Sequence, residues 1–73
     1  MAFRNELLLM WQKREYITSG AKAARIIGVS PSFYLDLLKG KKKPGIATLE
    51  KISDRTGIPI TELLSENEGE DER

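Results

Sequence analysis

A dense cluster of positive charge lies at the end of one predicted helix of the 73-residue chain and just after it: Lys39, Lys41, Lys42 and Lys43. Lysine ammonium groups bind phosphates. Such contacts fix the position of a protein on a nucleic acid without distinguishing one base sequence from another. Most charged runs are solvated loops with no partner, so the interpretation depends on the element that precedes the run. That element is Ser30–Lys39, and two weaker candidates for phosphate contacts, Lys22 and Arg25, stand shortly before it.

Histidine and cysteine are both absent from the chain. Their absence removes disulfides, thiolate nucleophiles, cysteine-based zinc sites and the commonest general base. The sequence also shows no glycine-rich phosphate loop and no carboxylate pair at a defined spacing. We therefore expect no enzyme, and we predict no catalytic residue, metal site or cofactor.

The net charge of +1 hides an uneven distribution along the chain. Five of the 11 acidic side chains, but only one of the 12 basic ones, fall in the last nine residues, SENEGEDER. This leaves 11 bases and six acids in residues 1–64, a net charge of +5, against −4 in residues 65–73. We expect one domain over residues 1–64 and an acidic, disordered tail over residues 65–73.

Five helices and no strands are predicted from periodicity and capping signals. Their expected ranges are residues 3–16, 21–27, 31–39, 46–56 and 59–64. The fold class is thus a compact, all-α, five-helix domain. No stretch approaches the roughly 18 apolar residues of a membrane span, and the N-terminus does not have the pattern of a signal peptide, so a cytoplasmic location is expected.

Local signals place the ends of the two central helices. Thr18 or Ser19 is expected to cap the second helix, which ends at Gly28, and Ser30 caps the third, with Pro31 at its first position. Buried positions are predicted from helical spacing in the first, third and fourth helices: Phe3, Leu7, Leu8, Met10, Trp11, Tyr34, Leu37, Leu38, Ile46, Leu49 and Ile52.

The turn Gly28-Val29-Ser30 is the only connection between the second and third helices. A turn of three residues that contains glycine joins two helices at a steep angle. The small side chain of Ala24 lets the helices approach, and Ile27 and Tyr34 fill the corner between them. This is a helix-turn-helix, whose second helix can enter the major groove of DNA.

Residues 19–64 resemble the phage-repressor class, the Cro-like and lambda-repressor-like helix-turn-helix domains. The resemblance rests on Ala24, IGVS at 27–30, GKKKP at 40–44, TLEKI at 48–52 and TGIPITELL at 56–64. It implies a five-helix domain that binds operator-like double-stranded DNA, often as a two-fold dimer. Ile60 and Leu64 of the last helix are expected to be exposed and to form the dimer contact.

The predicted DNA-binding residues divide by role. Ser30 begins the recognition helix, Ser32, Phe33 and Asp36 face bases, and the four lysines of residues 39–43 hold phosphates. Alternatives stay open for two of these residues. Phe33 contacts a thymine methyl group, contacts a protein or packs back against the domain; Asp36 accepts from a cytosine amino group or pairs with Lys39 or Lys22.

Three functions remain possible on this basis. The first is a sequence-specific transcriptional regulator of the repressor type. The second is a protein-binding module, such as an antirepressor or modulator of a partner repressor, that uses the exposed surface of Pro31, Phe33 and Leu35. The third is a non-specific DNA-coating protein. The charge asymmetry adds the hypothesis that the acidic tail competes with DNA for the basic face.

Overall fold

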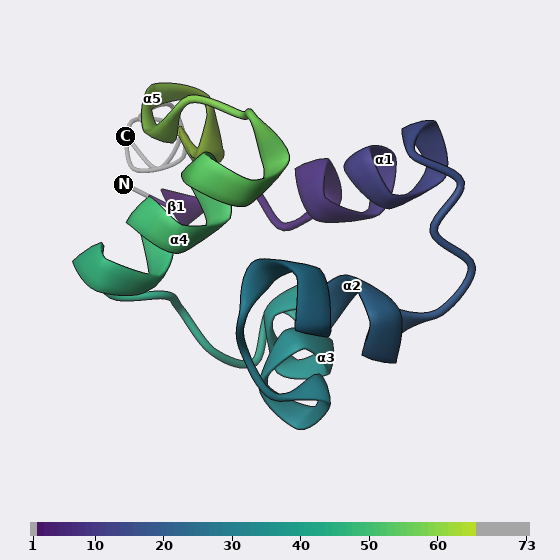
Figure 1. Ribbon diagram of the computed structural model, residues 1–73. Helices are drawn as coiled ribbons and strands as arrows, with labels where there is room; N and C mark the ends of the chain where they lie inside the picture. Colours follow the sequence, from purple (N-terminus) through teal and green to yellow (C-terminus); the bar gives the residue numbers. More distant parts are fainter. Residues whose placement is uncertain (1, 66–73) are drawn as a thin grey trace.

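The computed structural model describes residues 2–65, which form five helices and one pair of short strands (Figure 1). In chain order the elements are β1 Ala2–Phe3, α1 Glu6–Arg14, α2 Gly20–Ile27, α3 Pro31–Lys39, α4 Ile46–Thr56, α5 Ile60–Leu63 and β2 Leu64–Ser65. The predicted all-α class with five helices is confirmed. The acidic residues 66–73 lie outside the described residues.

The two strands pair the ends of the domain, and no strand was expected there. β1 runs antiparallel to β2, with Ala2 opposite Ser65 and Phe3 opposite Leu64. The backbone N–H of Arg4 then donates to the carbonyl of Leu63 at 2.7 Å. Because these backbone groups find partners in an extended conformation, α1 begins at Glu6 rather than at residue 3.

The hydrophobic core draws on all five helices and on the turn before α5. Its buried residues are Leu8, Trp11, Ala23, Ala24, Ile27, Tyr34, Leu37, Leu49, Ile52, Ile58 and Leu63. Trp11 and Tyr34 are core residues, as predicted. Phe3, Leu7 and Leu38 are partly buried and pack against this core.

Two residues predicted to be buried are instead exposed. Met10 is 59% exposed and Ile46 is 72% exposed. One turn takes 3.6 residues, so a spacing of three drifts by about 60° at each step. Ile46 therefore lies off the face that buries Leu49 and Ile52, and Met10 lies about 160° from Leu8 around α1.

The capping predictions for the two central helices are confirmed. Ser19 accepts a hydrogen bond from the backbone N–H of Lys22, and Ser30 accepts one from Phe33, each at 3.1 Å. Pro31 occupies the first turn of α3. No helix within residues 2–65 is long and apolar enough to cross a bilayer.

Candidate nucleic-acid interface

Helices α2 and α3 pack closely and are joined by a tight turn (Figure 1). Gly28 has a φ of 96°, a left-handed conformation that suits glycine. The backbone N–H groups of Gly28 and Val29 both donate to the carbonyl of Ala24, at 2.8 and 3.0 Å, which closes the end of α2. The predicted helix-turn-helix is therefore present, and α3 is its second helix.

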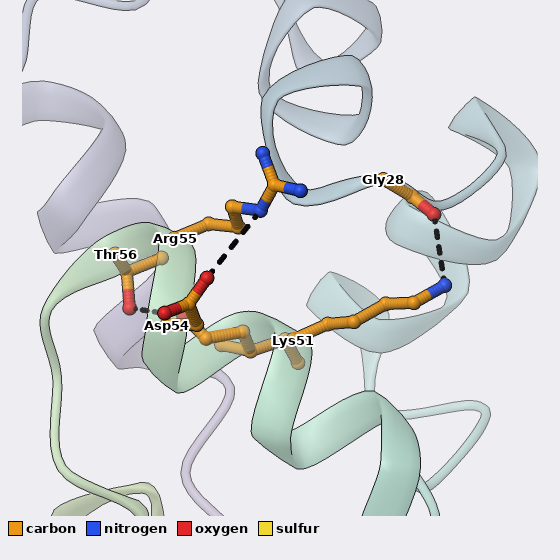
Figure 2. A network of polar contacts seen from close by, with 6 residues as sticks. Gly28, Lys51, Asp54, Arg55 and Thr56 are labelled. Carbon is orange, nitrogen blue, oxygen red and sulfur yellow. Dashed lines mark hydrogen bonds and ion pairs between the residues drawn. The ribbon is translucent and has the colours of Figure 1, made fainter.

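Lys51 of α4 braces this turn from outside the motif. Figure 2 shows its side chain extended toward Gly28, and its Nζ donates to the Gly28 carbonyl at 3.4 Å. Its neighbours on α4, Asp54 and Arg55, form an exposed ion pair at 3.7 Å (Figure 2). The sequence predicts no role for Lys51, because a contact across 23 residues leaves no local signal.

Helix α1 and the residue that precedes it fix α3 at two points. The Asn5 side-chain amide donates to the carbonyl of Leu38 at 3.0 Å, near the end of α3. The Tyr34 hydroxyl, in the middle of α3, donates to Gln12 Oε1 at 2.8 Å. Burial raises the pKa of Tyr34 to about 12, so its phenol keeps the proton that this hydrogen bond needs. The outward face of α3 is thus held on a rigid support.

The positive charge of the domain is concentrated in and around the helix-turn-helix. Residues 16–49 contain six basic side chains and a single acid, Asp36, a net charge of +5. The flanking residues 1–15 and 50–64 carry +1 and −1, which cancel. The basic residues of this segment are all exposed: Lys22, Arg25, Lys39, Lys41, Lys42 and Lys43.

Residues 40–45, which form the lysine loop between α3 and α4, fold back onto the end of α3. Gly40 has a φ of 77°, and the N–H of Lys41 donates to the Asp36 carbonyl at 2.8 Å, with that of Lys42 at 3.4 Å. This arrangement ends the helix and turns the loop along its side. The lysines therefore lie beside the second helix of the motif, and their contact with phosphate stays a prediction.

Asp36, Lys42 and Phe33 form a cluster on one side of α3. Lys42 Nζ lies 3.7 Å from Asp36 Oδ2 and 5.7 Å from the centre of the Phe33 ring. The prediction that Asp36 pairs with Lys39 or Lys22 is wrong. The loop brings Lys42 alongside Asp36, because the backbone N–H groups that follow the helix bond to the Asp36 carbonyl.

Ser32, predicted to face bases, and Lys39, predicted to hold a phosphate, both lie on α3 with Asp36. At about 100° per residue, Ser32, Asp36 and Lys39 lie within about 60° of one another, and Ser32 and Lys39 are exposed. Ser30 is also exposed, but its hydroxyl accepts the capping hydrogen bond.

The surface predicted for a protein partner is not continuously exposed. Pro31 is exposed and Leu35 is 46% exposed, but Phe33 is half-buried against the core. Of the three interpretations of Phe33, the structure supports packing against the domain. The predicted exposure of Ile60 and Leu64 is wrong, because both are half-buried against the core and Leu64 also pairs with Phe3.

Within residues 2–65, no group of three or more acidic side chains is gathered closely enough to hold a metal ion. The interface consists of a braced helix, exposed ammonium groups and a single carboxylate. Such a surface can bind a phosphate backbone and present polar groups to base edges.

The sequence of this chain matches sequences of known helix-turn-helix proteins. The model of the helix-turn-helix family matches residues 11–63. The transcriptional repressor RstR of the cryptic phage CTXphi from Vibrio cholerae is 40% identical over 47 residues, which cover 64% of this chain and 42% of that protein. This chain thus matches less than half the length of that relative. No solved structure matches significantly.

Proposed function

Because the chain belongs to the phage-repressor-like helix-turn-helix family, we propose that it is a sequence-specific transcriptional regulator that binds double-stranded DNA. The observation that carries the proposal is the coincidence of charge and geometry. The net charge of +5 falls within residues 16–49, and the same residues contain the helix-turn-helix and the loop beside it. The action is repressor-like, as the name of the Vibrio relative states for that protein.

In this proposal α3 lies in the major groove and the loop that follows it lies along the sugar-phosphate backbone. Ser32, Asp36 and Lys39 face base edges or the rim of the groove. Lys41 and Lys43 neutralise phosphates, with Lys22 and Arg25 of α2 contributing further charge. No catalytic step is involved, since regulation follows from occupancy of the site. The place of action is the cytoplasm, where the DNA lies.

Two copies bind together in this proposal, related by a two-fold axis. Their recognition helices then enter successive major grooves on one side of the duplex, about 34 Å apart. The two-fold symmetry of the protein pair is mirrored in the DNA sequence. An inverted repeat in the bound DNA sequence would therefore indicate that two copies bind about a two-fold axis.

The experiment is selection of bound duplexes from a random pool at near-physiological salt. Enrichment of a sequence with two inverted half-sites, about ten base pairs between centres, supports a dimeric regulator. Binding without enrichment identifies a non-specific coating protein and contradicts the proposal. The absence of binding contradicts it as well and leaves the protein-binding module as the function.

A further inference from the structure

The pairing of Lys42 with Asp36 has a counterpart in the edge of a base pair. We propose that these two side chains act as one unit that reads a single G·C base pair in the major groove, Lys42 donating to guanine and Asp36 accepting from cytosine. The inference rests on the proposed function and deepens it by assigning the residues that determine specificity.

The spacing of the two charged groups supports this assignment. Lys42 Nζ, a donor, lies 3.7 Å from Asp36 Oδ2, an acceptor. In a G·C pair, guanine O6 accepts and cytosine N4 donates, side by side in the major groove. A base-pair hydrogen bond joins these two atoms, so they lie about 3 Å apart. The protein pair and the base pair are therefore complementary in both order and separation.

An A·T pair presents a donor beside an acceptor as well, but it fits this unit less well. With lysine on thymine O4 and the carboxylate on adenine N6, the ammonium lies beside the thymine methyl group. The carboxylate then lies beside adenine N7, a second acceptor, which repels it. In the G·C pair the ammonium instead lies beside guanine N7, so it has two acceptors within reach.

Lys42 contacts α3 through both its backbone and its side chain in the absence of DNA. Its backbone N–H and that of Lys41 are directed at the Asp36 carbonyl. Its ammonium lies 5.7 Å from the centre of the Phe33 ring, and this ring is half-buried against the core. A lysine already confined in this way loses less conformational freedom on binding. We therefore assign to Phe33 the role of supporting the Lys42 side chain.

The carboxylate needs an explanation that charge attraction does not provide. Asp36 is the only acid among residues 16–49, and a carboxylate beside phosphates weakens binding to any DNA. Its ion pair with Lys42 contributes little to folding, because the lysine side chain is 58% exposed. Discrimination between base pairs accounts for its presence, since it penalises every sequence that offers no donor.

The test compares four proteins: the unchanged chain and the variants Asp36→Ala, Lys42→Ala and Lys43→Ala. Each is titrated with the selected duplex and with every single-base-pair substitution of one half-site, after its thermal unfolding is checked. We expect one G·C position at which the unchanged protein prefers G·C by roughly 5- to 150-fold. Asp36→Ala, which removes the acceptor, and Lys42→Ala, which removes the donor, lose that preference at the same position. Lys43→Ala keeps it and weakens binding to all duplexes alike.

Asp36→Ala is also expected to change the affinity for unrelated DNA, in the opposite direction. It removes a negative charge, so binding to unrelated DNA strengthens several-fold while binding to the selected site weakens. The double variant Asp36→Ala with Lys42→Ala loses no more base discrimination than either single variant, because the two side chains act together.

The outcomes separate this inference from the function on which it rests. A selected site whose base preferences survive Asp36→Ala overturns the inference and leaves a regulator. Loss of preference in Lys42→Ala and Lys43→Ala alike overturns it too, since the lysines are then interchangeable. The absence of an enriched site in the unchanged protein overturns the proposed function and the inference together.

Discussion

The Asn5 side chain donates a hydrogen bond to the Leu38 carbonyl across 33 residues of sequence, at 3.0 Å. Asn5 immediately precedes α1 and Leu38 lies at the end of α3, so the bond fixes the point where the recognition helix passes into the lysine loop. Removing it loosens that point while leaving every charged side chain in place.

Asn5→Ala is expected to lower the free energy of unfolding by about 1 kcal/mol, the usual net contribution of such a hydrogen bond. Asn5→Asp is expected to cost more, because a carboxylate cannot donate and places an acceptor against the carbonyl. Urea unfolding monitored by Trp11 fluorescence measures both. Glu6→Ala is the matched control and should change stability by less than about 0.5 kcal/mol. A similarly small change for Asn5→Ala would show that the bond has no part in stability.

Gly40→Ala is expected to destabilise the domain more than Gly28→Ala. Both glycines have a positive φ, 77° and 96°, so each substitution incurs strain of about 1–2 kcal/mol. At Gly40 the added Cβ also meets Asn5 Nδ2 at 3.3 Å, whereas at Gly28 it meets nothing within 4 Å. The difference between the two variants in urea unfolding therefore measures the contact with Asn5. Equal losses would assign the whole cost to backbone strain.

Stability is expected to fall between pH 10 and pH 12 because of Tyr34. Burial raises the pKa of Tyr34 to about 12 in the folded protein, against about 10 in the unfolded chain. The stabilisation is fully present below pH 10 and is lost as the pH rises through 12, about 2–3 kcal/mol in total. Lysines titrate in the same range, so Tyr34→Phe is the control. Its unfolding free energy should fall less steeply, and parallel curves would contradict the prediction.

Replacing Lys41, Lys42 and Lys43 with alanine is expected to flatten the salt dependence of DNA binding. Each lost phosphate contact reduces the slope of log K against log salt by about 0.9. A reduction of about 2 is expected, since Lys42 is assigned to a base pair. Lys13→Ala on α1 is the control, because Lys13 is exposed but lies outside the predicted interface. An unchanged slope in the triple variant would remove the loop from the interface.

Deleting residues 66–73 is expected to strengthen DNA binding at low salt. Ser65 pairs with Ala2, three residues before Asn5, whose side chain lies beside Gly40 at the start of the lysine loop. An extended chain of eight residues spans up to about 28 Å, which is enough to reach the lysine loop from Ser65 by way of these contacts. The five acids of this segment can therefore compete with phosphate.

Changing these acids to Gln or Asn is the control for deletion of the segment, because it removes charge alone. Both changes should raise affinity at low salt, and the gain should vanish at high salt, where charge is screened. Equal affinity with and without the segment at low salt would exclude competition.

The sequence predicted those parts of the fold that local chemistry determines. Ser19 and Ser30 mark the starts of two helices, and Gly28 marks the end of α2, because each satisfies backbone groups within a few residues. The spacing of the helix-turn-helix follows from these signals. A signal of the same kind, Gly40, marks the end of α3 and the start of the lysine loop.

Contacts made across the chain could not be predicted in this way. Within a helix, side chains meet at spacings of three and four, so Asp36 was expected to pair with Lys39. The turn after Gly40 brings Lys42 there instead, six residues on. The bonds from Asn5 to Leu38 and from Lys51 to Gly28, and the strand pair, likewise join residues whose proximity depends on the packed helices.

The antiparallel pairing of Ala2–Phe3 with Leu64–Ser65 places the two ends of the domain side by side. The first and last described residues are neighbours, so a short linker between them could replace the natural order of the chain. New ends opened between α3 and α4 would preserve the helix-turn-helix and interrupt only the lysine loop. Anything fused before Ala2 or after Ser65 leaves the domain at the same place.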